Sequence, residues 1–180
     1  MLIGRTQKMN EIVTSFCLRV KEQFQHYFSD SLVLDVGSMD INGNNRHLFN
    51  GCEYIGLDVG PGENVDVVCP VHLYAFRRRF DVIISTEMLE HDKYWEKSLR
   101  AMVRLLRSGG LLLITAASTR RREHGTTAMS SGSSPFTNDF YKSVTCSDLN
   151  MGLNFSRNFS EHRCVVSPNR KDVHFWGIKK

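Results

Sequence analysis

Five short apolar segments constrain the fold of this chain more than any other feature of its sequence. Aliphatic and β-branched residues follow one another in them with little polar alternation, which is typical of strands buried on both faces of a parallel sheet. The segments are LVLDV (32–36), YIGLD (54–58), VDVV (65–68), FDVIIS (80–85) and LLLITAA (111–117). They predict an α/β fold, because parallel strands are joined by crossovers that place helices on the faces of the sheet.

Two helical patterns accompany these segments. Apolar residues recur every three or four positions between residues 10 and 28, as on the buried face of a helix that packs on a sheet. These residues are Ile12, Phe16, Val20, Phe24 and Tyr27. A second pattern precedes the strand at 111–117. We expect this helix to start near Asp92, a favourable N-cap, and to stop at Gly109–Gly110, where glycine accepts a left-handed backbone.

The C-terminal part of the chain predicts two further strands, 162–167 and 173–178, which a turn joins into an antiparallel hairpin. With 180 residues, of which 41% are hydrophobic and 23% charged, the chain is long enough for one globular domain. We therefore predict a doubly wound, Rossmann-like α/β domain with a seven-stranded sheet, mostly parallel, whose last strand is antiparallel. Its expected parts are an N-terminal helix (1–30), a core (31–117), a long loop (118–145) and a C-terminal hairpin (146–180).

The cysteines favour a reducing compartment. They are five in number, scattered, and include no C-x-x-C pair, which predicts reduced thiols rather than a disulfide framework or a zinc site. No metal site is expected. The first residues, MLIGRTQKMNEI, contain no continuous apolar segment, and no stretch approaches the roughly 20 apolar residues of a membrane span. We expect a cytoplasmic protein without a membrane partner.

The formal net charge of +4 is mild, although two arginine runs occur, at 77–79 and 120–122. The first run precedes a strand and fits a solvated surface turn. The second lies in the long loop, where it is either solvated or faces an anionic acceptor molecule. Nucleic acid is weakly supported as a partner, because a broad basic surface with interleaved aromatic residues is lacking.

The residues that follow the first two strands indicate a nucleoside ligand. Ligands of open α/β sheets bind at the carboxyl ends of the strands, where Asp35, Gly37 and Ser38 follow the first strand and Asp58 ends the second. An acid at this spacing suits the two hydroxyls of a ribose. Each residue also has a structural interpretation, Asp35 as a turn cap and Asp58 as an ordinary strand end. No second glycine follows Gly37 closely, which argues against a pyrophosphate and hence against an NAD(P)-dependent oxidoreductase.

The order VLDVGS, YIGLD, FDVIISTEMLEH and LLRSGGLLLIT resembles the class I S-adenosylmethionine-dependent methyltransferases, specifically the small type 11 branch, over residues 31–117. The resemblance implies S-adenosylmethionine as the cofactor, with its methionine part at the first turn and its ribose on the second-strand acid. Family members often carry an acid after the third strand that binds adenine, whereas Cys69–Pro70 stands there in this sequence. The resemblance therefore implies that the backbone or Asp66 binds adenine. The implied cofactor-binding residues are Asp35, Gly37, Ser38, Asp58, Val59, Asp66, Thr86 and Glu87.

The resemblance implies methyl transfer by in-line displacement, for which positioning supplies much of the acceleration. A base is needed only if the acceptor carries a proton. Glu87, His91 and His124 are the candidate catalytic residues, and histidine is best suited to neutral pH. His91 has a structural alternative as a helix-start residue that bonds the backbone. Residues 118–145 are expected to form a lid over a small-molecule or anionic acceptor. A non-catalytic binding module of the same fold is the alternative function.

Overall fold

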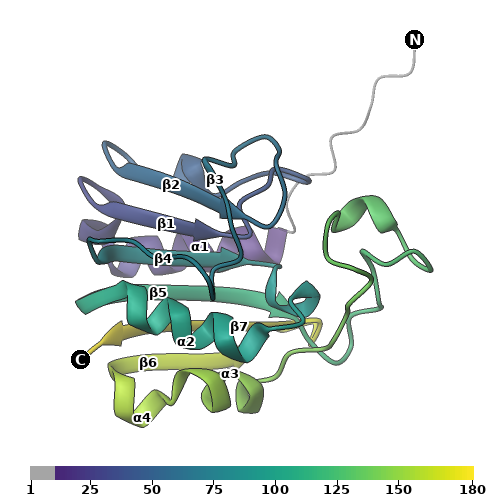
Figure 1. Ribbon diagram of the computed structural model, residues 1–180. Coiled ribbons are helices and arrows are strands. Elements are labelled where there is room, and N and C mark those ends of the chain that lie inside the picture. Colours follow the sequence, from purple (N-terminus) through teal and green to yellow (C-terminus); the bar gives the residue numbers. More distant parts are fainter. Residues whose placement is uncertain (1–10) are drawn as a thin grey trace.

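The computed structural model describes residues 11–180 and contains one seven-stranded sheet (Figure 1). The strands are β1 (Leu32–Val36), β2 (Glu53–Asp58), β3 (Val67–Val68), β4 (Phe80–Thr86), β5 (Leu106–Ala117), β6 (Phe159–Val166) and β7 (Asp172–Lys179). Their order is β3-β2-β1-β4-β5-β7-β6, and β7 alone runs in the direction opposite to the other six strands. The predicted fold class, with an antiparallel last strand, is confirmed.

Helices cover both faces of this sheet (Figure 1). The α-helices are α1 (Glu11–Gln23), α2 (Trp95–Leu105), α3 (Cys146–Leu153) and α4 (Phe155–Asn158). Short 3-10 helices are η1 (Gln25–Phe28), η2 (Arg46–Leu48), η3 (Leu89–His91) and η4 (Ser131–Ser133). The helix predicted within 10–28 is found as α1 and η1, whereas the earlier part of the N-terminal segment 1–30 lies outside the described residues. Between residues 11 and 180, no helix combines the length and the apolar character that a membrane crossing requires.

Each face of the sheet has its own apolar core. Successive residues of a strand point to opposite faces, so Val33 joins the core beneath α1, whereas Leu34 joins the core beneath α2 and α3. Val20 of α1 and Met102 of α2 are buried in these two cores. Burial on both faces explains why the central strands read as continuous apolar runs.

The bounds predicted for the second helix are wrong at both ends. α2 begins at Trp95 rather than near Asp92, whose carboxylate accepts a hydrogen bond from the Tyr94 amide at 2.7 Å and so stabilises the turn that precedes the helix. The helix ends at Leu105, and Gly109–Gly110 lies inside β5. The β4–β5 register shifts here between Phe80 and Val82, so this glycine pair lies where the pairing is irregular and does not end a helix.

The C-terminal region contains two helices that the hairpin prediction for 146–180 omits. Thr145 and Asp148 form a capping box at the start of α3: the Asp148 amide donates to Thr145 Oγ1 at 3.2 Å, and the Thr145 amide donates to Asp148 Oδ2 at 2.8 Å. The T-x-x-D spacing of this box is visible in the sequence and is the signal that could have predicted the helix. Packing of α3 against α2 requires Gly152, because a Cβ there would lie 2.4 Å from Leu99 Cδ1.

The expectation that all five cysteines are reduced is wrong. Cys146 and Cys164 form a disulfide with their Cα atoms 5.9 Å apart, which joins the start of α3 to β6. Sequence spacing could not show this pair, because the two residues meet only when α3 folds over the sheet. Cys17, Cys52 and Cys69 are free thiols. The cysteine pattern therefore no longer argues for the cytoplasm.

We predict that Cys146→Ser lowers the free energy of unfolding by about 2–4 kcal/mol, because it releases a loop whose ends are 18 residues apart. Urea denaturation without reductant measures the change, and addition of reductant to the unmodified chain should reproduce it. Cys52→Ser is the matched control and should leave the transition nearly unchanged. Equal stability of the Cys146 variant and the unmodified chain would contradict the prediction.

Candidate functional site

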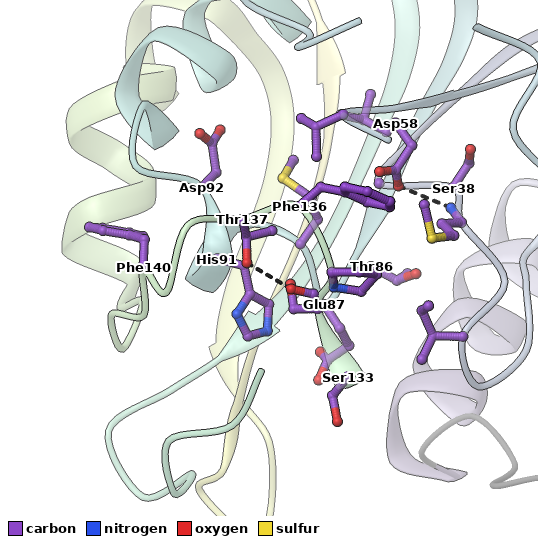
Figure 2. Close-up of a pocket in the computed structure, with 18 of the residues that line it drawn as sticks. Ser38, Asp58, Thr86, Glu87, His91, Asp92, Ser133, Phe136, Thr137 and Phe140 are labelled. Carbon is purple, nitrogen blue, oxygen red and sulfur yellow. Dashed lines mark hydrogen bonds between the residues drawn. The ribbon is translucent and has the colours of Figure 1, made fainter. Parts of the chain in front are cut away.

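One large cavity lies at the carboxyl ends of the parallel strands (Figure 2). Its volume is about 1710 Å³, larger than the roughly 300–1,000 Å³ of ordinary small-molecule sites. Its walls come from the segments that follow β1, β2, β3 and β4 and from the long loop at 118–145. The size is sufficient for two ligands side by side.

The turn after β1 forms one wall of this cavity. Gly37 has a left-handed backbone, with φ of +80°, and a Cβ on it would lie 2.5 Å from Met88 Cβ. The amides of Gly37 and Ser38 both donate to the Leu57 carbonyl, at 2.9 and 3.2 Å. The Ser38 hydroxyl donates to the Asn64 carbonyl at 3.1 Å, and the Ser38 carbonyl accepts from Asn64 Nδ2 at 2.8 Å, so Asn64 holds this turn in place at the cavity wall.

Asp35, at the end of β1, is 1% exposed yet borders the cavity. Its carboxylate accepts hydrogen bonds from the Tyr54 hydroxyl at 2.5 Å and from Asn45 Nδ2 at 3.3 Å. Asn45 Nδ2 also donates to Thr86 Oγ1 at 3.0 Å and so links the ends of β1 and β4. Burial raises the pKa of Asp35 to about 6, although both hydrogen bonds favour its charged form.

Asp58, at the end of β2, presents its carboxylate at the cavity wall beside the exposed side chain of Val59. Oδ2 accepts from the Met39 amide at 3.1 Å and Oδ1 from the Gly60 amide at 3.3 Å. These bonds fix the carboxylate and leave acceptor positions on both oxygens. The ring of Phe136 packs on Gly60, where a Cβ would lie 2.1 Å from Phe136 Cδ2, so the loop reaches across the cavity to Asp58 (Figure 2).

Asp66 is the one predicted cofactor-binding residue that does not line the cavity. Its Oδ2 accepts from the Gly56 amide at 2.7 Å and pairs with Arg46 at 3.0 Å, on the outer side of β2. Cys69 and Pro70 border the cavity in its place. The side chain of Asp66 is thus committed to the structure of the loop that precedes β3.

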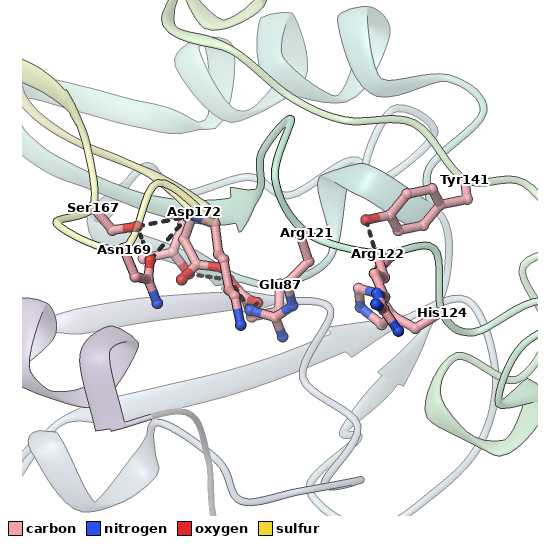
Figure 3. A network of polar contacts seen from close by, with 10 residues as sticks. Glu87, Arg121, Arg122, His124, Tyr141, Ser167, Asn169 and Asp172 are labelled. Atoms are coloured by element: carbon pink, nitrogen blue, oxygen red, sulfur yellow. Dashed lines mark hydrogen bonds and ion pairs between the residues drawn. The ribbon is translucent and has the colours of Figure 1, made fainter.

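Glu87, directly after β4, has a left-handed backbone with φ of +56°. Its Oε1 accepts from Thr115 Oγ1 at 3.1 Å, and its Oε2 pairs with Arg121 at 3.2 Å. Arg121 also pairs with the fully buried Asp172 at 2.6 Å (Figure 3). Burial raises the pKa of Glu87 to about 7, against the lowering effect of Arg121. One arginine thus serves two buried carboxylates.

His91 and His124 line the same cavity and pack edge to face, with their ring centroids 4.9 Å apart. Tyr141 lies against both rings. Burial, followed by the proximity of His124, lowers the pKa of His91 to about 4, and burial also lowers the pKa of His124. Both imidazoles are therefore neutral at pH 7, with a lone pair that can accept a proton or bind a ligand.

The structure brings all the other predicted residues to one cavity: Asp35, Gly37, Ser38, Asp58, Val59, Thr86, Glu87, His91 and His124. It adds Asn45 and Tyr54, which hold Asp35, and no pattern in the sequence points to these two residues. It also adds Arg121, whose run of arginines is visible in the sequence but whose two carboxylate partners are not.

Residues 10–168 match the sequence model of a protein family, the methyltransferase domain. The chain belongs to this family. The resemblance found in the sequence is thereby confirmed, and S-adenosylmethionine as the expected cofactor agrees with it. A comparison with curated proteins gave no match.

Solved structures show the same fold as this methyltransferase-family chain. The 1,6-didemethyltoxoflavin-N1-methyltransferase of Burkholderia thailandensis, solved with 1,6-didemethyltoxoflavin and S-adenosylhomocysteine, superposes with a TM-score of 0.66 at 15% identity, over 94% of this chain and 78% of that one. The N-methyltransferase NodS of Bradyrhizobium japonicum superposes with a TM-score of 0.61 at 13% identity, over 95% of this chain and 98% of NodS. Phosphoethanolamine N-methyltransferase 2 of Haemonchus contortus, solved with S-adenosylmethionine, superposes with a TM-score of 0.62 at 16% identity, over 91% of this chain and 52% of that one. This chain therefore spans about half of the length of that enzyme.

We predict that Asp35→Asn alters the pH dependence of stability. The folded pKa of about 6 exceeds the ordinary value of 3.8, so the stabilisation from protonated Asp35 is complete below about pH 3.8 and is lost as the pH rises through 6. Between pH 4 and pH 8, the free energy of unfolding of the variant should rise by roughly 1–3 kcal/mol relative to that of the unmodified chain, as measured by urea denaturation at each pH. Tyr54→Phe removes a hydrogen bond to the carboxylate and should steepen the loss. A difference independent of pH would contradict the assignment.

Proposed function

We propose that this chain binds S-adenosylmethionine in the cavity and transfers its methyl group to a small anionic acceptor beneath loop 118–145. One observation carries the proposal: the β1 turn, the Asp58 carboxylate and two neutral imidazoles face a single cavity that has room for a cofactor and an acceptor. The relatives solved with S-adenosylmethionine or S-adenosylhomocysteine share this fold, which supports the choice of cofactor.

In this proposal, cofactor binding depends on Asp58. Its two oxygens are held by loop amides, and their remaining lone pairs suit the adjacent hydroxyls of a ribose. The β1 turn lies beside it and would receive the methionine part, where buried Asp35 is near enough to favour an ammonium group. Val59 and Cys69 border the side on which adenine would lie. No side-chain acid reaches that side from Asp66, so adenine would be held by the backbone and by apolar contacts.

The charge of the loop supports an anionic acceptor. Arg120, Arg122 and Lys171 line the cavity, and none of them pairs with a carboxylate among residues 11–180. Arg121, by contrast, is committed to Glu87 and Asp172. Arg120 and Arg122 belong to the loop, and Lys171 lies in the turn between β6 and β7. A carboxylate or phosphate group on the acceptor would complement them.

The reaction requires little chemistry from the protein. The methyl carbon leaves the sulfonium sulfur as its bond to the acceptor forms, and the sulfur keeps the electron pair of the broken bond. Alignment of the two ligands and exclusion of water by the loop would supply much of the rate. If the acceptor carries a proton, Glu87, with a pKa of about 7, is better matched to take it than His91, whose pKa is lowered to about 4, and His124 is the other candidate.

Calorimetric titration with S-adenosylhomocysteine tests the cofactor site. We expect one molecule to bind per chain, and we expect Asp58→Asn to weaken binding by roughly 10- to 100-fold, or about 1.5–3 kcal/mol, the scale of a hydrogen bond to a charged group. Asp66→Asn is the matched control and should leave the affinity within about twofold, because Asp66 lies outside the cavity and asparagine keeps an acceptor for the Gly56 amide.

The same titration separates the alternatives. Absence of heat with both S-adenosylmethionine and S-adenosylhomocysteine would overturn the proposal, and binding of NADH instead would indicate an oxidoreductase. Binding of the cofactor without methyl transfer to any of a set of carboxylate- and phosphate-bearing acceptors would favour a non-catalytic module. An equal loss of affinity in the Asp58 and Asp66 variants would remove Asp58 from the ribose site.

A further inference from the structure

Glu90, His91 and His124 form a compact group of metal-ligating side chains at the loop side of the cavity. One ligand atom from each residue lies within 4.8 Å of the ligand atoms of the other two. Glu90 and His91 are adjacent in η3, whereas His124 comes from the long loop. Two elements of the fold meet here: the 3-10 helix η3 and loop 118–145.

The carboxylate of Glu90 lacks the neutralising partner that a buried acid needs. Glu90 is 0% exposed, and among residues 11–180 its oxygens have no side-chain hydrogen-bond partner, although the backbone amides of Glu90 and Ala117 lie close enough to favour its charged form. Arg121, whose charge acts on Glu90, forms its ion pairs with Glu87 and Asp172 instead. A buried carboxyl group without a charged partner either keeps its proton or binds a cation, and burial raises the pKa of Glu90 well above its usual value. This unpartnered side chain is independent support for a cation.

The imidazole of His124 is held as metal-bound histidines usually are. The Arg122 carbonyl lies 3.0 Å from His124 Nδ1 and accepts its proton, which leaves Nε2 as the lone-pair nitrogen (Figure 3). Such a carbonyl fixes the tautomer of a ligating histidine. His91 Nδ1 is buried without a partner in the described chain. Space beside it depends on Gly125, because a Cβ there would lie 3.1 Å from this nitrogen.

We propose that Glu90, His91 and His124 bind one divalent transition-metal ion of the zinc or manganese type. Two imidazoles and one carboxylate are a donor set that such ions accept, with bonds of about 2.0–2.2 Å. Ligand atoms around such an ion are about 3.0–3.5 Å apart, so the group must contract from its present separation. His124 belongs to the loop, and a small shift of that segment toward η3 achieves this.

The ion would act on the acceptor, an inference that rests on the proposed function. His91 and His124 both line the cavity, and three protein ligands leave coordination positions open toward it. An acceptor with a hydroxyl or carboxylate oxygen would coordinate there. The acceptor would then combine this oxygen ligand with the negative charge that Arg120 and Arg122 favour. A coordinated hydroxyl loses its proton to solvent more readily, and the resulting oxygen then forms the bond to the methyl carbon as the carbon–sulfur bond breaks.

Titration of the metal-stripped protein with Zn²⁺ in the calorimeter, and with Co²⁺ by visible absorption, tests the site. We expect one ion per chain and a loss of affinity of about 100-fold or more in His124→Ala. His47→Ala is the matched control and should leave metal binding unchanged, because His47 is exposed on η2, where it contacts the Asn44 carbonyl. Glu90→Gln keeps the shape of the carboxylate and should also abolish tight binding. Circular dichroism verifies that each variant is folded.

The outcomes separate this proposal from the proposed function. No binding of either ion at millimolar concentration, or equal binding by His124→Ala and the unmodified chain, overturns the metal site. Titration with S-adenosylhomocysteine in the presence of a chelator reports the cofactor site alone. Loss of metal binding with intact cofactor binding would leave the methyltransferase proposal standing, and metal binding without cofactor binding would overturn only that proposal.

Discussion

Parallel pairing of β1 with β2 on one side and β4 on the other is the constraint on which the site depends. Asp35 is paired in register with Gly56 and Ile84, so the three strands end at nearly the same level. Asp58 and Thr86 each lie two residues beyond these partners. The polar residues that follow three separate strands are thus forced to one edge of the sheet. The apolar strands beneath them, buried on both faces, hold that edge rigid.

The charged side chains at this edge of the sheet are unevenly paired, and the pairing differs between the two ends of the cavity. Arg121 serves Glu87 and Asp172 together (Figure 3), whereas Glu90 is buried with no cation beside it. Asp35 is supported by a tyrosine hydroxyl and an amide, which are neutral donors. On the loop side, Arg120 and Arg122 remain uncommitted. The cavity therefore has a cofactor end with fixed acceptors and a loop end with free cations, neutral imidazoles and one uncompensated acid.

Local signals predicted much of this arrangement, and their failures have identifiable causes. The strands follow from continuous apolar runs and α1 from hydrophobic periodicity. The position of Asp58 at the cavity follows because a strand-end acid has a fixed place in this topology. α3 was missed although its Thr145 capping box is local, because the segment has little apolar periodicity. Asp66 was assigned to the cofactor, but its side chain is used by Gly56 and Arg46. Sequence position shows which strand end a residue follows, but not which way its side chain turns.

The sequence by itself determined the strand segments, the predominantly parallel sheet, and the turn and acid that make it resemble the methyltransferases. These depend on periodicity and on spacing along the chain, which are local quantities. Only the tertiary structure decided the Cys146–Cys164 disulfide, the sharing of Arg121 between Glu87 and Asp172, and the approach of His124 to Glu90 and His91. The cysteines meet because α3 folds over the sheet, and the other groups meet because the loop after β5 folds back over the ends of the strands. No local pattern in the sequence specifies either arrangement.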